Sequence, residues 1–189
     1  MLIKKISIIV CATAGMLVSS FASAQTYLGG SVGQNDTNNN CNYSTTCDSK
    51  ATSFKVFGGY DINKNFAVES SYFSSGKTSV NAGLLGGMEI KKTGLSLAGL
   101  YKYEFNEALA GFAKLGVARI KTETSYQTSG LSPYSASYTE NQALLGLGLT
   151  YKISTNLSLR GEYEKYNPKT FSSRGTAMSN LSVGMQYNF

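Results

Sequence analysis

The chain has 189 residues, of which only 15% are charged, and it contains neither His nor Trp. The absence of His excludes the catalytic triads and dyads that depend on an imidazole, together with most metal sites. A soluble domain usually carries roughly 25 to 35% charged residues on its surface, whereas this chain has 20 Gly, 13 Tyr and only 2 Pro. The composition favours a β-sheet protein whose outer surface faces something other than water.

The first 24 residues have the pattern of a secretory signal peptide. Lys4 and Lys5 form a basic start, an apolar stretch covers residues 6–18, and Ala22-Ser23-Ala24 is a small-residue cleavage signature before Gln25. The apolar stretch is shorter than the roughly 20 residues that a transmembrane helix needs. We therefore expect residues 1–24 to be removed after export.

The mature chain, residues 25–189, is predicted to be one domain, because no linker rich in Pro or Ser divides it. The whole chain carries 17 Lys and Arg against 11 Asp and Glu, and removal of Lys4 and Lys5 lowers its net charge from +6 to +4. This excess is too small and too scattered to indicate a nucleic-acid partner.

After residue 24 the sequence alternates between apolar and polar residues, which is typical of strands. The clearest stretch places Leu145, Leu147 and Leu149 on one face, with Gly146 and Gly148 on the other. The alternation predicts eight strands, at about residues 26–34, 52–61, 66–74, 88–105, 108–124, 138–153, 157–166 and 177–189. Most of them supply the roughly 9 to 11 residues that a tilted strand needs to cross a bilayer.

Three short connections share a frame that begins at Tyr60, Tyr103 and Tyr151. In each, an aromatic residue or Ile follows two positions later and an apolar residue six positions later, across a polar turn. The other connections are long and polar, at about residues 35–51, 75–87, 125–137 and 167–176. Three hairpins that alternate with long loops predict an antiparallel barrel with both termini at the short-turn end.

An eight-stranded barrel can be apolar inside, as in lipocalin-like carriers, or apolar outside, as in outer-membrane barrels, and alternation leaves both open. The small residues of the polar face suit a narrow interior filled by side chains. Tyr and Phe recur near strand ends on the apolar face, as in an interfacial girdle: Tyr60, Phe66, Tyr103, Phe105, Tyr151, Tyr187 and Phe189, with Tyr72 and Tyr163 further along. Together with the short and long connections at opposite ends, these features favour a transmembrane barrel.

Three segments resemble OmpA-type transmembrane barrels and their small OmpX-like relatives. They are Phe57-Gly-Gly-Tyr-Asp-Ile62, Leu159-Arg-Gly-Glu-Tyr163, and the ending Leu181-x-Val-x-Met-x-Tyr-x-Phe189. The resemblance spans about residues 26–189 and implies an all-β, eight-stranded barrel in the outer membrane of a Gram-negative bacterium, in contact with outer-membrane lipid and lipopolysaccharide. Tyr187 and Phe189 match the ending that the outer-membrane assembly machinery reads in this family. The peptidoglycan-binding domain of full-length OmpA proteins is expected to be absent.

Four charged residues are expected to face one another in the lumen. Counting from each Tyr of the repeated frame places Glu69 level with Arg160, and Lys114 level with Glu162. An unpaired charge in so narrow an interior costs several kcal/mol, so we expect these residues to pair. The resemblance implies the same, because the four match a Glu, Arg, Arg and Glu network of OmpA-type barrels, with Lys114 in place of an Arg. A further family lysine falls on Leu100, which puts in doubt the salt-bridge switching proposed for the family's pore.

Cys41 and Cys47 lie in the first long loop. Because export places them in an oxidising compartment, we expect a disulfide between them, although two free thiols are an alternative. The cluster Gly29-Gly30-x-x-Gly33 has no helix after it, so we interpret it as barrel packing rather than as a phosphate loop.

These features predict a non-enzymatic protein with no catalytic residue, metal or cofactor. It would support envelope integrity and display polar loops to a surface ligand, for adhesion or immune evasion. A narrow ion channel is the alternative, if the lumen charges leave a continuous water path. An outer-membrane acylase or protease is disfavoured because the barrel enzymes that it would resemble rely on His. A soluble lipocalin-like binder is a further alternative, and fractionation of cells with and without detergent would distinguish it from a membrane protein.

Overall fold

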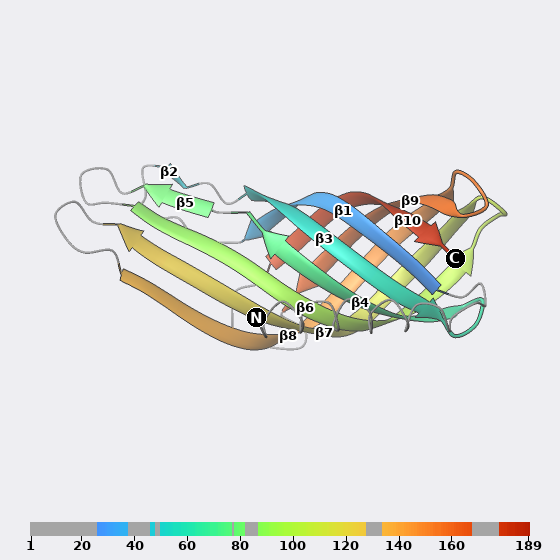
Figure 1. The fold of residues 1–189 in the computed structure, drawn as a ribbon, viewed down its shortest axis with the longest axis horizontal. Coiled ribbons are helices and arrows are strands. Elements are labelled where there is room, and N and C mark those ends of the chain that lie inside the picture. Colours follow the sequence, from blue (N-terminus) through green and yellow to red (C-terminus); the bar gives the residue numbers. More distant parts are fainter. Residues whose placement is uncertain are drawn as a thin grey trace, which may run out of the picture.

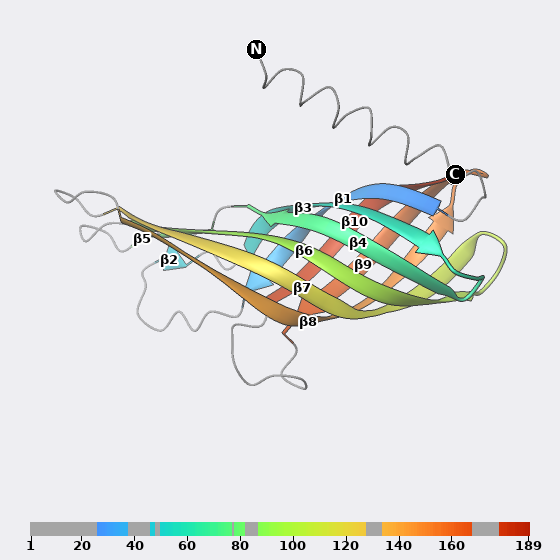
Figure 2. The same ribbon diagram turned by 60° about the horizontal axis from the view of Figure 1, so that its bottom comes forward.

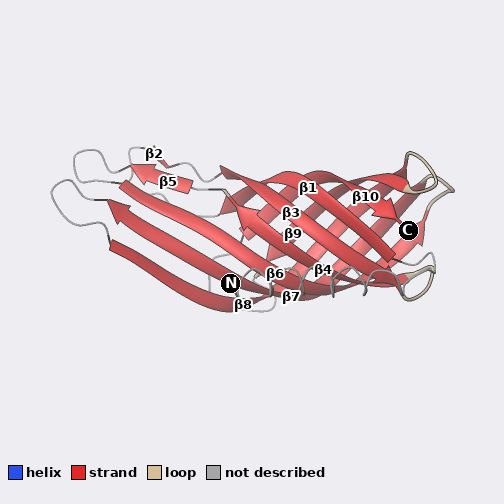
Figure 3. Ribbon diagram, in the orientation of Figure 1, coloured by secondary structure: helices blue, strands red, loops and turns tan. Residues whose placement is uncertain are grey.

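A computed structural model describes residues 26–37, 46–47, 50–76, 78–81, 87–127, 134–167 and 178–189. In these ranges every regular element is a strand (Figure 3). The described part of the chain also holds no helix that is long and apolar enough to cross a membrane. The predicted signal peptide, residues 1–24, lies outside the described residues and stays a prediction.

Eight strands form a closed antiparallel barrel, in which each strand pairs with the next and β1 pairs with β10 (Figures 1 and 2). They are β1 (Thr26–Thr37), β3 (Lys50–Asp61), β4 (Phe66–Ser75), β6 (Gly87–Glu104), β7 (Leu109–Gln127), β8 (Tyr134–Lys152), β9 (Leu157–Tyr166) and β10 (Met178–Asn188). Two short strands, β2 (Thr46–Cys47) and β5 (Thr78–Asn81), extend the sheet from β6 outside the barrel. The predicted eight-stranded barrel is confirmed.

The three short turns lie together at one end of the barrel, drawn in tan in Figure 3. In each turn the same position of the repeated frame carries an oxygen that accepts hydrogen bonds from backbone N–H groups. Asn63 Oδ1 and Asn106 Oδ1 each accept two, at 2.8 and 2.9 Å, from the residues two and three positions later. Ser154 Oγ accepts one, from Leu157 at 3.2 Å. The sequence repeat therefore corresponds to a repeated turn structure, in which a short polar side chain accepts the hydrogen bonds of backbone N–H groups that have no backbone acceptor in the turn.

The apolar face of the strands points outward. Leu147 and Leu149 are 65% and 52% exposed, whereas polar residues on the opposite face are buried. The soluble lipocalin-like alternative, with its apolar interior, is therefore wrong. Every predicted girdle residue is exposed, and three ring pairs pack edge to face at 5.1 to 5.4 Å: Phe66 with Tyr101, Tyr103 with Phe105, and Tyr187 with Phe189.

Four of the aromatic residues that point into the barrel interior each lie directly opposite a glycine on the neighbouring strand. The pairs are Tyr27 with Gly59, Phe57 with Gly29, Phe73 with Gly94, and Phe112 with Gly148. A Cβ atom on Gly29 would lie 2.3 Å from Phe57 Cζ, so no larger residue fits beneath the ring. The cluster at Gly29 thus serves barrel packing, as the sequence predicts.

Strands β6, β7 and β8 rise beyond their neighbours as a sheet outside the barrel, at the end opposite the turns (Figures 1 and 2). We define this protruding sheet as residues 87–93, 121–127 and 134–142. Here the predicted bounds are too short, because β7 and β8 continue into residues 125–137, which the sequence assigns to a loop. Residues 134–139 are exposed on both faces, so this part of β8 has no buried face to impose alternation.

Candidate functional site

Six ionisable side chains meet in the middle of the lumen and form what we call the ion-pair network. They are Lys55 on β3, Glu69 on β4, Lys114 on β7, and Arg160, Glu162 and Glu164 on β9. Each is at most 4% exposed. Three cations face three carboxylates, so the network balances its own charge, as burial in a low-dielectric interior requires.

Arg160 lies at the end of the network nearest the short turns. Its guanidinium makes two hydrogen bonds to the Glu69 carboxylate, at 2.7 and 3.2 Å, and a separate ion pair to Glu162 at 3.2 Å. The guanidinium carbon also lies 4.4 and 4.2 Å from the ring centroids of Phe57 and Phe112, so two aromatic faces enclose it. The Tyr27 hydroxyl donates to Glu69 at 2.9 Å. These contacts fix the guanidinium in position and orientation.

The two lysines connect the remaining carboxylates. Lys114 Nζ lies 2.6 Å from Glu69 and 3.1 Å from Glu164, and it also contacts Glu162. Lys55 Nζ lies 2.7 Å from Glu162 and 2.9 Å from Glu164. Every carboxylate therefore has at least two cationic partners, from different strands. The network ties β3, β4, β7 and β9 together across the lumen.

The structure brings together the residues that the sequence singles out. Arg160 meets Glu69, and Lys114 meets Glu162, as the repeated frame requires. Leu100, on which the resemblance places a further family lysine, is buried at 2% exposure. The third cation comes instead from Lys55, on another strand, which the sequence analysis missed.

Glu164 was also missed, although alternation could have found both residues. Lys55 stands between Phe54 and Val56, two outward apolar residues, and Glu164 follows Glu162 by two positions. The predicted disulfide between Cys41 and Cys47 falls on residues whose side chains lie outside the described part of the chain, and it stays a prediction.

An apolar layer closes the lumen between the ion-pair network and the protruding sheet. It consists of Phe73, Ile120, Leu144, Tyr166 and Met178, each at most 3% exposed. The rings of Phe73 and Tyr166 lie 5.0 Å apart across the lumen. Below the network, toward the short turns, a polar vestibule of about 600 Å³ is lined by Asp61, Lys102, Glu104 and Lys152, among others, and reaches Arg160. The vestibule therefore reaches the network from the short-turn side, whereas buried, mainly apolar side chains pack on the other side.

The family model of the OmpA-like transmembrane domain matches residues 22–189, so the chain belongs to this family. No curated protein sequence matched it. The fold resembles that of Ail, the attachment invasion locus protein of Yersinia pestis, with 17% identity, 88% of this chain and 99% of that chain covered, and a TM-score of 0.63. A second structure of Ail holds the heparin analogue sucrose octasulfate.

Two further solved structures have the same fold. Neisserial surface protein A is 16% identical over 87% of this chain and 97% of that chain, with a TM-score of 0.57. The N-terminal β-barrel domain of Pseudomonas aeruginosa OprF is 15% identical over 86% and 98%, with a TM-score of 0.53. The protein is therefore a β-barrel of the Gram-negative outer membrane.

Proposed function

We propose that this barrel is a non-enzymatic scaffold that supports the integrity of the envelope and presents its protruding sheet and long loops to a surface ligand. The observation that carries the proposal is the closed lumen combined with the extended outer ends of β6, β7 and β8. A closed lumen favours a structural role over transport, and a sheet that stands clear of the barrel is accessible from outside.

The lumen argues for a scaffold in two ways. The ion-pair network cross-links four strands, and breaking a buried pair costs several kcal/mol, so its residues hold the wall in shape. In the layer beyond it, Phe73, Ile120, Leu144 and Met178 offer no polar side-chain group to a passing ion, and the Tyr166 hydroxyl already donates to Glu164 at 3.2 Å. The role of Glu69, Lys114, Arg160 and Glu162 in this proposal is to lock the barrel.

A narrow channel is the second candidate, and the polar vestibule at the short-turn end is the observation that favours it. Recordings from the purified protein in planar lipid bilayers separate the two. The scaffold predicts no steady conductance. Steady conductance that changes when Arg160 is replaced by Ala would overturn the scaffold in favour of a gated channel.

For the surface ligand we propose a polyanionic glycan. Lys91, Arg119 and Lys121 lie exposed on the outward face of β6 and β7, at or just below the protruding sheet, with Glu123 as a nearby acidic residue. The complex of Ail with a heparin analogue supports this class of ligand, because it shows that a barrel of the same fold can hold one.

The test is adhesion of cells that display the protein to a surface coated with heparin. Changing Lys91, Arg119 and Lys121 together to Gln should reduce adhesion several-fold. Lys64→Gln, in an exposed turn at the opposite end of the barrel, is the matched control and should leave adhesion unchanged. Equal adhesion by the triple variant and the control would overturn the glycan proposal.

A further inference from the structure

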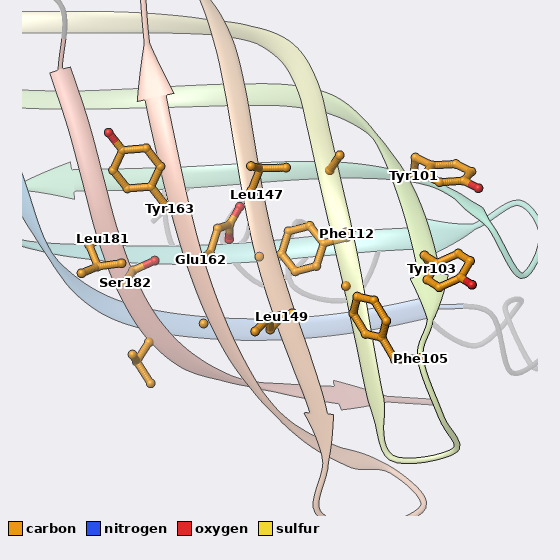
Figure 4. A pocket seen from close by; sticks show the side chains of 15 residues that line it. Tyr101, Tyr103, Phe105, Phe112, Leu147, Leu149, Glu162, Tyr163, Leu181 and Ser182 are labelled. Carbon is orange, nitrogen blue, oxygen red and sulfur yellow. The ribbon is translucent and has the colours of Figure 1, made fainter.

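The membrane-facing wall is hollowed by a furrow of about 730 Å³ that crosses β4, β6, β7, β8 and β9. Two rows of outward residues border it, each row made of direct neighbours on paired strands. One row begins at Phe66 on β4 and ends at Tyr163 on β9, and the other begins at Val68 and ends at Lys165. A second furrow, of about 650 Å³, lies on the far side of the first row; Figure 4 shows it with Tyr101, Leu147 and Tyr163 along the shared row.

Small side chains create the hollow. Gly99 and Ala113 point outward between the bulky Tyr101, Leu115 and Leu147, all of which line the furrow. A Cβ atom on Gly99 would have its nearest neighbour, the Leu115 carbonyl oxygen, at 4.0 Å. A larger residue would therefore fit the backbone at this position. The glycine keeps the space open on a surface that faces acyl chains.

The furrow climbs the barrel, because a row that runs perpendicular to tilted strands rises around the wall. Phe66 is the first residue after a short turn, whereas Lys165 is the penultimate residue of β9, at the opposite end of the wall. Lys165 is exposed and has no ion-pair partner within the described ranges. Arg119, also exposed, lies on the outward face of β7 further toward the protruding sheet. The furrow is thus lined mainly by apolar residues along its length, and cationic side chains lie at its outer end.

We propose that this furrow binds one acyl chain of a phosphorylated glycolipid of the outer leaflet, a lipopolysaccharide, with a lipid phosphate beside Lys165. The apolar floor matches a hydrocarbon chain, and the ammonium group at the outer end matches a phosphate at the level of the headgroups. The connections that the sequence predicts to be long join the strands at this end of the barrel, so Lys165 faces the outer leaflet rather than the inner one. The site lies outside the ion-pair network, and Lys165, which lines the furrow, does not belong to the proposed glycan surface.

Native mass spectrometry of the protein, refolded in detergent and supplied with bisphosphorylated lipid A, tests the furrow. Gly99→Leu fills it without a backbone clash. Gly30→Leu is the matched control, because Gly30 is also outward, its added Cβ would lie 3.7 Å from the nearest atom, and it does not line the furrow. The wild type and the control should retain one lipid, whereas Gly99→Leu should bind it roughly tenfold more weakly, which corresponds to one decade in Kd.

Lys165→Gln tests the headgroup contact. It should reduce the preference for bisphosphorylated over dephosphorylated lipid A several-fold, while the folded band on a gel without heating stays unchanged. Equal lipid retention by Gly99→Leu and Gly30→Leu would overturn the proposal. When phosphatidylethanolamine is supplied beside lipid A, its exclusive retention would also overturn the proposal, because it would assign the furrow to an inner-leaflet lipid. A dimer that Gly99→Leu dissociates would assign the furrow to a second copy of the chain and would overturn it as well.

Discussion

Strands β6, β7 and β8 pass through two environments along their length. In the barrel wall their side chains alternate sharply, as Leu144 at 0% and Leu147 at 65% exposure illustrate on β8. In residues 134–139, the part of β8 that lies in the protruding sheet beyond residue 140, the alternation is lost: Tyr134 and Tyr138 are 67% and 54% exposed, and both faces of this stretch are exposed. The ladder between β7 and β8 nevertheless continues without a break from Leu109 to Tyr126. Backbone hydrogen bonding is therefore enough to form a strand, whereas the alternation of buried and exposed side chains arises only where one face of the strand meets the lumen and the other meets lipid.

Charges differ between the two regions in the same way. The lumen buries three cations against three carboxylates, whereas the protruding sheet carries the Lys121–Glu123 pair with about half of each side chain exposed. A buried charge that loses its partner stays desolvated, but an exposed one is hydrated by water. The following substitutions should separate the two regions by the size of their effects.

The largest effect is expected for Arg160→Ala in the lumen. It leaves Glu69 with one fewer cation and empties the space between Phe57 and Phe112, so it should lower the free energy of unfolding by about 3 to 5 kcal/mol. Unfolding titrations in lipid vesicles measure this. Arg119→Ala, on the exposed face of β7, is the matched control and should change the stability by no more than about 0.5 kcal/mol.

The double variant Arg160→Ala with Glu69→Ala shows whether the loss comes from pairing. Removal of both partners should recover part of the stability, because residues in one network are not additive. Strictly additive losses would contradict the coupling that the geometry indicates.

A smaller loss is expected on the lipid-facing side of the same wall. Leu147→Arg places a charge near the middle of the membrane and should destabilise the barrel by about 2 to 4 kcal/mol. Tyr138→Arg, on the same strand but in the protruding sheet, should cost no more than about 0.5 kcal/mol. The inward change Thr150→Ser should also cost little. Equal losses at positions 147 and 138 would mean that the membrane extends further up β8 than the exposure pattern indicates.

Packing inside the barrel can be tested with two glycines on adjacent strands. Gly148→Ala would place a Cβ atom 2.3 Å from the Phe112 ring and 2.7 Å from the Gly161 carbonyl oxygen. Such overpacking should cost about 1 to 3 kcal/mol. Gly161→Ala points outward, has no neighbour within 4 Å, and should leave the unfolding curve unchanged. A tolerated Gly148→Ala would show that the Phe112 ring can move aside.

The smallest effect concerns the protruding sheet. A hydrogen bond from Lys121, together with its positive charge, lowers the pKa of Glu123 below its usual value. The pair therefore stabilises the sheet above the usual carboxyl pKa, and this contribution disappears as the pH falls through the lowered value. Lys121→Ala should raise the pKa of Glu123 toward the ordinary range, as followed by NMR titration. Added salt should raise the pKa of Glu123 in the same way. If neither Lys121→Ala nor salt changes this pKa, the Lys121–Glu123 pair does not form in solution.

The sequence predicts the barrel wall well because the wall separates two media. The bounds predicted for β9, 157–166, coincide with those observed, and β4 differs by one residue. Where β7 and β8 leave the membrane, the same reasoning fails, since no periodic signal marks a strand exposed on both faces. Residues 125–137 illustrate this limit.

The ion-pair network is only partly predictable for a different reason. The repeated frame aligns strands that follow a short turn, so it relates Glu69 to Arg160 and Lys114 to Glu162. Lys55 lies on a strand that precedes its turn, and the frame has no register for it. The enclosure of Arg160 by Phe57 and Phe112 depends on the stagger of strands around the barrel, which hydrogen bonding between distant strands determines and no local pattern encodes.

The pairing of β1 with β10 has a consequence for how the protein folds. This last seam joins the two ends of the barrel sequence, with the Phe189 amide donating to the Thr26 carbonyl at 3.0 Å, so its contacts have the greatest sequence separation among the described strand pairs. Contacts between residues far apart in the sequence form slowly, because the chain loses the entropy of closing a long loop before the contacts stabilise the fold. Until they form, the edges of β1 and β10 would expose unpaired backbone N–H and C=O groups to lipid. Such groups are energetically costly in the hydrocarbon core, because no water is present to hydrogen-bond with them. Membrane crossing and barrel closure should therefore occur as one concerted event, with no half-closed sheet accumulating in the bilayer.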